Sequence, residues 1–303
     1  MKHMEAFRNG NSQREFHQSF RSQSAMEYLM TYGWAILIIA VVLAALFELG
    51  VFNPMTFAPK ASPGSCQVVR PEGPGTTAFI SLAGECNGEI PQYVAQFNGQ
   101  TGQYIAGDVP LDIPNTNPIT VTAWIYYKGN TGNWEGIFGI NWGCPFEHLA
   151  VLSNYLYLDD CGNDGGNFAS FPVPKNTWVF VAYTLSGTNL IMHENSNNQS
   201  FTLSGTYQIT PNAFDIGTEG VNLNRPSFNG SIANIQVYDT ALSSNDIKAL
   251  YQEGIGGAPI KIQNLVGWWP LNGNANDYSG NGNNGVPTNV IYTSNWYSGY
   301  SAP

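Results

Sequence analysis

The feature that most constrains the fold is a series of short runs of β-branched and aromatic residues between Tyr93 and Asp239. Gly, Asn, Pro or Ser ends each run, as in "ITVTAWIYY" (119–127) and "WVFVAYTLS" (178–186). Alternating runs separated by turns at about 8–12-residue spacing are typical of a β-sandwich or a barrel. The sequence therefore predicts a mainly β domain, with one clear helical stretch at 240–254.

The composition fits this interpretation. Aromatic residues make up 13% of the 303 residues and charged residues only 11%, as expected for a β domain rich in tight turns. The formal net charge is −10, and no basic block follows residue 21. We therefore expect no nucleic-acid partner.

An apolar stretch from about Ala25 to Phe52 precedes the β-rich region. As a helix it is long enough to cross the ~30 Å hydrocarbon layer of a bilayer. Basic residues lie before it, so the positive-inside rule predicts a single-pass protein of the cell surface, with everything after Phe52 outside the cell. A cleaved secretory signal peptide and a simple anchor are two interpretations. The first fits less well, because the apolar stretch is long and no small-x-small cleavage site follows it.

A third interpretation rests on Glu27, a carboxylate at the start of the apolar stretch. The residues "RSQSAMEY" (21–28) resemble the N-terminus of archaeal type IV pilin-like proteins, which carry a class III signal peptide. The resemblance implies that a leader peptidase removes residues 1–22 by cutting between Ser22 and Gln23. Ser22 departs from the family, in which Gly or Ala is more usual.

The same resemblance implies a role for the new N-terminus. Residues 23–52 would form one long hydrophobic helix, whose residues 23–50 anchor the chain in the membrane and then pack against other pilin-like subunits. The amine of Gln23 can pair with Glu27 of a neighbouring subunit, because a paired carboxylate costs less at membrane depth than a lone one. The alternative without a role in assembly is that Glu27 lies at a solvated helix end.

Residues 53–87 are rich in Pro, Gly and Ser and predict a spacer. Four cysteines follow the hydrophobic segment, an even number that favours disulfides in an oxidising, extracellular setting. Local pairing is one of the three connectivities they allow, and it would join Cys66 to Cys86 and Cys144 to Cys161. Zinc is the alternative, with His148 as the only nearby helper.

Four stretches together resemble a laminin-G-like jelly roll of the concanavalin A type. They are Phe97-Asn98-Gly99, "ITVTAWIYY" (119–127), "NTWVFVAYTLSGTNLIMHEN" (176–195) and "FNGSIANIQVYDTALSSNDIKALYQEG" (228–254). The last is the most specific, because turn, strand and short closing helix recur in that order across the family. The resemblance implies a jelly-roll β-sandwich over residues 88–303.

One stretch is out of order. "LVGWWPLNGNANDYSGNGNNG" (265–285) resembles the opening strand of such domains but follows the closing helix. The two termini of a domain often lie close together, so a circularly permuted connection costs little free energy. We predict that residues 265–270 pair into the sheet that holds 93–97 and 231–238. The alternative is a second, truncated repeat packed on the outside.

Calcium is the one cofactor the sequence suggests. It takes six to eight hard oxygen ligands, and related domains often hold a structural calcium near such turns. The candidate ligands are Asn272, Asn274 and Asp277, and the alternative is a series of Asn-Gly and Ser-Gly turns. A second acidic loop contains Asp159, Asp160 and Asp164.

Aromatic residues in the loop-rich part of the sandwich are candidates for sugar stacking: Trp134, Trp142, Tyr155 and Tyr157. Asp159 and Asp160 could select hydroxyl groups beside them. Packing in the core is the alternative. The sequons at Asn198 (N-Q-S) and Asn229 (N-G-S) are candidate glycosylation sites.

No spacing suggests a nucleophile with its base or a pair of catalytic carboxylates, so we expect no enzyme. The favoured interpretation is a pilin-like surface subunit that displays the jelly roll for adhesion to glycans or proteins. A tethered lectin that never polymerises is the alternative, and a surface glycan-processing enzyme is the minor one.

Overall fold

The computed structural model describes residues 12–49, 51, 60–114, 118–140, 147–160, 168–203, 213–219 and 225–303. The chain divides into two compact units, Met1–Ala58 and Pro59–Pro303. Each unit is described by itself.

The first unit contains helix α1 (Ser12–Glu48). Apolar side chains in its second half are exposed, including Trp34 at 65% and Phe47 at 75%. Among the residues described, no helix is both long and apolar enough to cross a membrane. Ser22, Gln23 and Glu27 fall within α1, but their side chains are not among those described.

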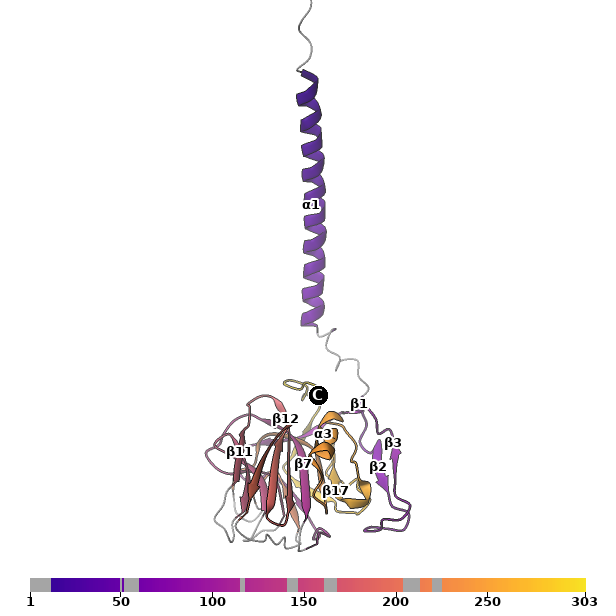
Figure 1. Ribbon diagram of the computed structural model, residues 1–303, viewed down its shortest axis with the longest axis vertical. Helices are drawn as coiled ribbons and strands as arrows, with labels where there is room; N and C mark the ends of the chain where they lie inside the picture. The colour runs from indigo at the N-terminus through magenta and orange to yellow at the C-terminus, as the bar shows by residue number, and fades with distance from the viewer. Residues whose placement is uncertain are drawn as a thin grey trace, which may run out of the picture. The chain divides into compact units, whose positions relative to one another are not determined.

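The second unit is built around two antiparallel sheets (Figure 1). In the described part of the chain, the seven-stranded sheet contains, in spatial order, β11 (Phe168–Pro172), β10 (Tyr155–Asp160), β9 (Glu147–Leu152), β8 (Glu135–Ile140), β15 (Phe214–Ile216), β6 (Tyr104–Gly107) and β18 (Gly285–Thr288). The eight-stranded sheet contains β14 (Asn197–Thr202), β13 (Asn189–Glu194), β12 (Trp178–Ser186), β7 (Ile119–Tyr127), β16 (Asn229–Tyr238), β5 (Val94–Asn98) and β19 (Ile291–Thr293), and β17 (Leu265–Trp269) pairs with β16.

The hydrophobic core lies between the sheets, and the period of two sets which side chains enter it. On β7, the alternating residues Ile119, Val121, Ala123 and Ile125 belong to the core cluster, and the residues that alternate with them, such as Trp124, face the other way. Apolar residues of the seven-stranded sheet belong to the same core cluster and face them: Ile105, Phe138, Leu149, Leu156, Leu158, Phe214 and Ile216. Each fully buried large apolar side chain contributes roughly 1.5–3 kcal/mol. The predicted β-sandwich is therefore confirmed.

The C-terminal segment completes both sheets. Strand β17 pairs antiparallel with β16, with Ile235 opposite Trp269, and β19 pairs with β5. Strand β18 joins the other sheet beside β6. The prediction that 265–270 enter the sheet of 93–97 and 231–238 is confirmed, and this stretch is part of the sandwich rather than a second repeat.

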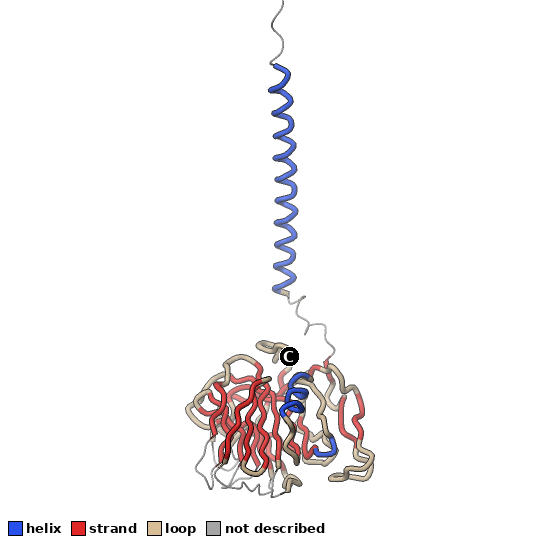
Figure 2. The backbone as a smooth tube through the Cα atoms, in the orientation of Figure 1, coloured by secondary structure: helices blue, strands red, loops and turns tan. Residues whose placement is uncertain are grey.

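The predicted closing helix is α3 (Ser244–Gln252), the short blue helix beside the strands in Figure 2. Ser243 caps it by accepting a hydrogen bond from the backbone N–H of Asp246, and the Asp246 carboxylate accepts in return from the Ser243 N–H. This capping box satisfies two N–H groups that the first turn leaves free. Ile247 and Leu250 are the buried side chains that fix α3 to the sandwich.

The described part of the predicted spacer, residues 53–87, contains three short strands, one of which pairs with a strand just beyond it. Strand β1 (Lys60–Ala61) pairs with β4 (Ile90–Pro91), and β2 (Cys66–Val69) pairs with β3 (Ser81–Gly84). The disulfide between Cys66 and Cys86 closes this hairpin, as predicted. Cys144 and Cys161 lie outside the described residues.

Arg70 fastens this N-terminal arm, residues 60–91, to the C-terminal segment. Its guanidinium donates hydrogen bonds of 2.5–3.0 Å to four backbone carbonyls, those of Thr76, Ile262, Leu265 and Ser279. Burial lowers the pKa of Arg70, and the nearby carboxylates of Asp277 and Asp239 oppose that change. The arm is thus held by one cation that reaches both ends of the domain.

Candidate ligand-binding site

Polar residues occupy the outer face of the seven-stranded sheet, the face that points away from the core. In the strand register Asp215 on β15 lies opposite Gly139 on β8, and Gly139 lies opposite His148 on β9. Their neighbours along the strands, such as Phe138 and Leu149, enter the core. Because side chains alternate between faces, Asp215 and His148 belong to the outer face.

Asp215 and His148 form a buried pair. The His148 Nε2 lies 3.2 Å from the Asp215 Oδ2, and the two side chains are only 1% and 0% exposed. Gly139 makes this contact possible, since a Cβ there would lie 1.8 Å from the His148 ring. Among the described residues the Asp215 Oδ1 has no hydrogen-bond partner. A buried acceptor without a partner is costly, so the position favours a ligand that donates a hydrogen bond.

Aromatic side chains lie on the same face, one row further along the strands. Tyr157 on β10 is opposite Ala150, two residues from His148. Trp134, just before β8, meets the Tyr157 ring edge-on at 5.1 Å. Tyr155 is 46% exposed. These three aromatic residues, Trp134, Tyr155 and Tyr157, are called the aromatic patch below.

A charged pair lies close to this row. The Arg225 Nη1 is 2.5 Å from the Glu219 Oε2, and Glu219 is fully buried whereas the Arg225 side chain is 38% exposed. The Glu219 backbone nitrogen would lie 2.8 Å from a Cβ at Gly136, the residue opposite Ala150. Arg225 therefore offers N–H donors to solvent near the aromatic patch.

The structure brings together part of the predicted ligand site. Trp134, Tyr155 and Tyr157 lie on one face, and the register puts Asp159 opposite His148 on that face. Asp160 takes the next position along β10, opposite Glu147. The side chains of Asp159 and Asp160 are not among those described, and Trp142 and Asp164 lie outside the described residues.

Sequence reasoning missed Asp215, Glu219 and Arg225, and it treated His148 only as a helper to zinc. One signal was available: Asp215 interrupts the apolar run "AFDIG" at an outward position of a strand. A carboxylate in such a run must have a partner or a function.

The predicted calcium turn uses its oxygens internally. The Asp277 carboxylate accepts hydrogen bonds from the backbone N–H groups of Trp268, Ser279 and Asn283 and from the Ser279 hydroxyl. The side-chain oxygens of Asn272 and Asn274 accept from the Tyr93 and Asn276 N–H groups. No group of three His, Cys, Asp or Glu in the described ranges is arranged to hold a metal. Calcium binding at this turn stays a prediction, and the ion would have to compete with these donors.

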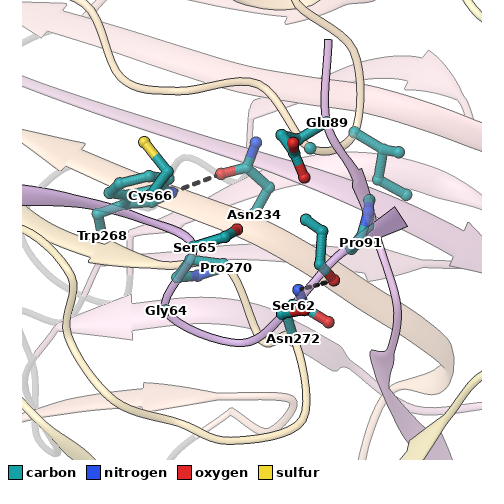
Figure 3. A pocket seen from close by; sticks show the side chains of 13 residues that line it. Ser62, Gly64, Ser65, Cys66, Glu89, Pro91, Asn234, Trp268, Pro270 and Asn272 are labelled. Atoms are coloured by element: carbon teal, nitrogen blue, oxygen red, sulfur yellow. Dashed lines mark hydrogen bonds between the residues drawn. The ribbon is translucent and has the colours of Figure 1, made fainter. Parts of the chain in front are cut away.

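A small cavity lies where the N-terminal arm meets the eight-stranded sheet (Figure 3). Its volume is about 30 Å³, and its walls include Ser62, Cys66 and Glu89. The indole N–H of Trp268 donates to Asn234 at 2.7 Å beside it. A cavity of this size holds about one water molecule, so it is part of the packing and not a ligand site.

Aromatic residues also cover the outer face of the eight-stranded sheet, but here they are buried. Trp124 stacks on Tyr251 of α3 at 5.9 Å, and Trp178 meets Trp296 edge-on at 5.8 Å. Trp124, Trp178 and Trp296 are 2%, 5% and 3% exposed. His193 on the same face is 3% exposed, and burial lowers its pKa to about 4.

Comparisons with known proteins support the observed fold. Residues 98–248 match the model described as the concanavalin A-like lectin/glucanases superfamily. A Bacteroides ovatus protein whose proposed role is carbohydrate binding aligns with a TM-score of 0.54 and 17% identity, over 71% of this chain and 63% of its own. The native heptameric SAP-like pentraxin of Limulus polyphemus aligns with a TM-score of 0.48 and 18% identity, over 66% of this chain and 94% of its own.

Because the sequence identity is so low, the first alignment is evidence for a shared fold alone. The second has a TM-score below 0.5, and we draw no conclusion from it. No curated protein is significantly similar in sequence to this chain. The family match and the two packed sheets together confirm that the chain carries a laminin-G-like jelly-roll domain of the concanavalin A type.

Proposed function

We propose that the jelly-roll domain binds glycans on the outer face of its seven-stranded sheet. The observation that carries the proposal is the aromatic patch on the same face as Asp215, a buried carboxylate with one oxygen that lacks a hydrogen-bond partner among the described residues. This arrangement combines an apolar surface with a fixed acceptor, the two elements by which small polar molecules are held and oriented.

The aromatic half and the polar half of the site suit different parts of a sugar, the C–H groups of the ring and its hydroxyl groups. The exposed faces of Tyr155 and Trp134 can pack against the C–H groups of the ring. The Asp215 Oδ1 is itself buried, so a hydroxyl has to enter between the neighbouring side chains to donate to it, and His148 holds the other carboxylate oxygen in place. Arg225 can donate to a hydroxyl or an acidic group of the glycan.

The proposed role of the Bacteroides ovatus protein agrees with glycan binding here. We propose binding without catalysis, because the Asp215 carboxylate is already paired with His148.

A glycan array probed with the full-length chain in detergent tests the proposal. We expect selective binding that is lost in Trp134→Ala and in Asp215→Asn. Phe79→Ala is the matched control, since Phe79 is an aromatic residue on the arm and is 81% exposed. A blank array, or binding that survives both site variants, would refute glycan binding at this face.

We further propose that residues 23–50 anchor the domain at the cell surface and join it to other pilin-like subunits after the leader is removed. The exposed apolar side chains of α1 favour this role, because such a surface needs lipid or another helix to cover it. Mass spectrometry of the native N-terminus tests it directly. A chain that begins at Gln23 supports processing, whereas an intact Met1 leaves a tethered lectin. Glu27→Gln should then impair filament growth without preventing membrane insertion.

A further inference from the structure

We propose that Asn198 is a site of N-linked glycosylation in the exported protein and that Asn229, the other sequon whose environment the structure describes, is not modified. Both lie in an Asn-x-Ser sequence, Asn198-Gln199-Ser200 and Asn229-Gly230-Ser231. The sequence alone gives them equal weight, but their surroundings differ.

Asn198 lies on a strand that a large modification can reach. It belongs to β14, the edge strand of the eight-stranded sheet, next to the turn at Asn195 and Ser196. Both Asn198 and Ser200 are exposed. Within the described residues no hydrogen bond holds the Asn198 amide, so its nitrogen is free to take a substituent.

The register also gives the direction of the Asn198 side chain. Asn198 lies opposite His193, whose neighbour Met192 belongs to the core cluster. Asn198 therefore points to the outer side of the sheet, whereas Phe201 on the same strand packs against the core. A glycan on Asn198 would extend into solvent and displace no core side chain.

Asn229 is held inside the fold. Its Nδ2, the atom that a glycan would occupy, donates to the Gly129 carbonyl at 2.9 Å. Its backbone N–H donates to the buried Glu135 carboxylate, also at 2.9 Å. The Asn229 Cγ would lie only 3.2 Å from a Cβ at Gly99. A glycan here would replace one N–H of an amide that is already bonded to Gly129, in a position closely packed against the turn at Gly99.

The transfer needs a co-reactant of a defined class, an oligosaccharide bound through phosphate to a lipid carrier. A new bond forms between the Asn198 Nδ2 and the anomeric carbon of the sugar, and the bond from that carbon to the carrier phosphate breaks. The amide loses one proton to a base, and the carrier leaves as its phosphate or diphosphate. No oxidation or reduction takes place.

The modification has a physical consequence for the fold. An edge strand presents unpaired backbone groups that can pair with another sheet. Strand β14 is six residues long and has five exposed residues, without a proline or a charged side chain. A bulky, soluble glycan on its second residue would keep this edge from pairing with other chains.

Peptide mapping by mass spectrometry of the protein from its native cells tests the proposal. We expect the Asn198 peptide to carry a glycan mass and the Asn229 peptide to be unmodified. Asn198→Gln and Ser200→Ala should each remove the glycan from the intact chain, because each destroys the same sequon in a different residue. Asn229→Gln should leave the glycan mass unchanged.

An unmodified Asn198 peptide in the native protein would overturn the proposal, and so would a glycan on Asn229. The native peptide map decides the question even if a variant fails to fold. Glycan binding by the aromatic patch is independent of this result, because β14 and the patch lie in different sheets.

Discussion

The two sheets of the sandwich both carry aromatic residues on their outer faces, yet the two faces differ in exposure. On the eight-stranded sheet, Trp124 and its neighbours are covered by α3 and the C-terminal segment. On the seven-stranded sheet, Tyr155 remains 46% exposed beside the Asp215–His148 pair. The difference in burial separates a packing surface from a candidate binding surface, although both carry aromatic residues.

The largest expected effect is a loss of stability on the buried outer face of the eight-stranded sheet. Trp124→Ala should lower the free energy of unfolding by about 3–5 kcal/mol, because it removes a buried indole that contacts Tyr251, Phe180 and Tyr300. Denaturant unfolding followed by tryptophan fluorescence measures this loss. Glycan affinity of the folded fraction should be unchanged, and a specific loss of affinity would show that the two faces are not separate.

Removal of the disulfide tests whether the N-terminal arm supports the sandwich as a whole. Replacing Cys66 and Cys86 together by Ser should cost about 3 kcal/mol, because the unfolded chain regains the freedom of a loop of 20 residues. Unfolding of wild type with and without a reductant gives the same comparison. If neither treatment changes the midpoint, the arm and the sandwich unfold independently.

A binding measurement sharpens the functional side of the comparison. Tyr157→Ala should weaken glycan binding about tenfold, or about 1.4 kcal/mol, because it removes both a stacking surface and the support of Trp134. Calorimetry with a ligand from the array measures the change. Tyr251→Ala on the opposite face is the control, and equal losses in the two variants would contradict the assignment of the site.

The smallest expected effect concerns pH. Burial lowers the pKa of His193 to about 4, so between pH 6.5 and 4 the unfolded chain binds a proton that the folded chain does not. The stability is therefore complete above pH 6.5 and falls as the pH drops, by about 1 kcal/mol at pH 5.5.

The variant His193→Gln isolates this effect. Burial raises the pKa of Glu135 and Glu194, which changes stability in the opposite sense, and the variant retains both carboxylates. Chemical unfolding at pH 7 and pH 5.5 should show a smaller loss in the variant than in wild type. Identical losses would show that His193 takes up its proton without unfolding.

Much of the fold could be predicted from the sequence, because alternation and turn residues are local signals. The same holds for α3, whose cap at Ser243 and terminal Gly254 are visible in the sequence, and for β17, whose pairing follows from its likeness to an opening strand. The part played by Arg70 could not be predicted, since three of its four acceptors lie more than 190 residues away.

The candidate site was only half predictable. Trp134 could be singled out because it lies in a turn-rich stretch of the sequence. The burial of Trp124 depends on α3 and the C-terminal segment, whose positions a single sequence does not give. The contact between Asp215 and His148 depends on Gly139, which leaves room for the imidazole across a strand that separates them. Such cross-strand contacts depend on register, which a single sequence specifies weakly.

The clamp made by Arg70 would have a mechanical consequence under the proposed anchoring of the domain through residues 23–50. A pull applied at Lys60 would act first on the β1–β4 pair and on the Ala61 carbonyl, which accepts from Asn272, and then on the disulfide-closed hairpin and the guanidinium. Arg70 shares that load among carbonyls drawn from both ends of the sandwich, so the strands are strained together rather than unzipped one by one. We therefore expect the arm to remain attached to the C-terminal segment when the chain is pulled from Lys60.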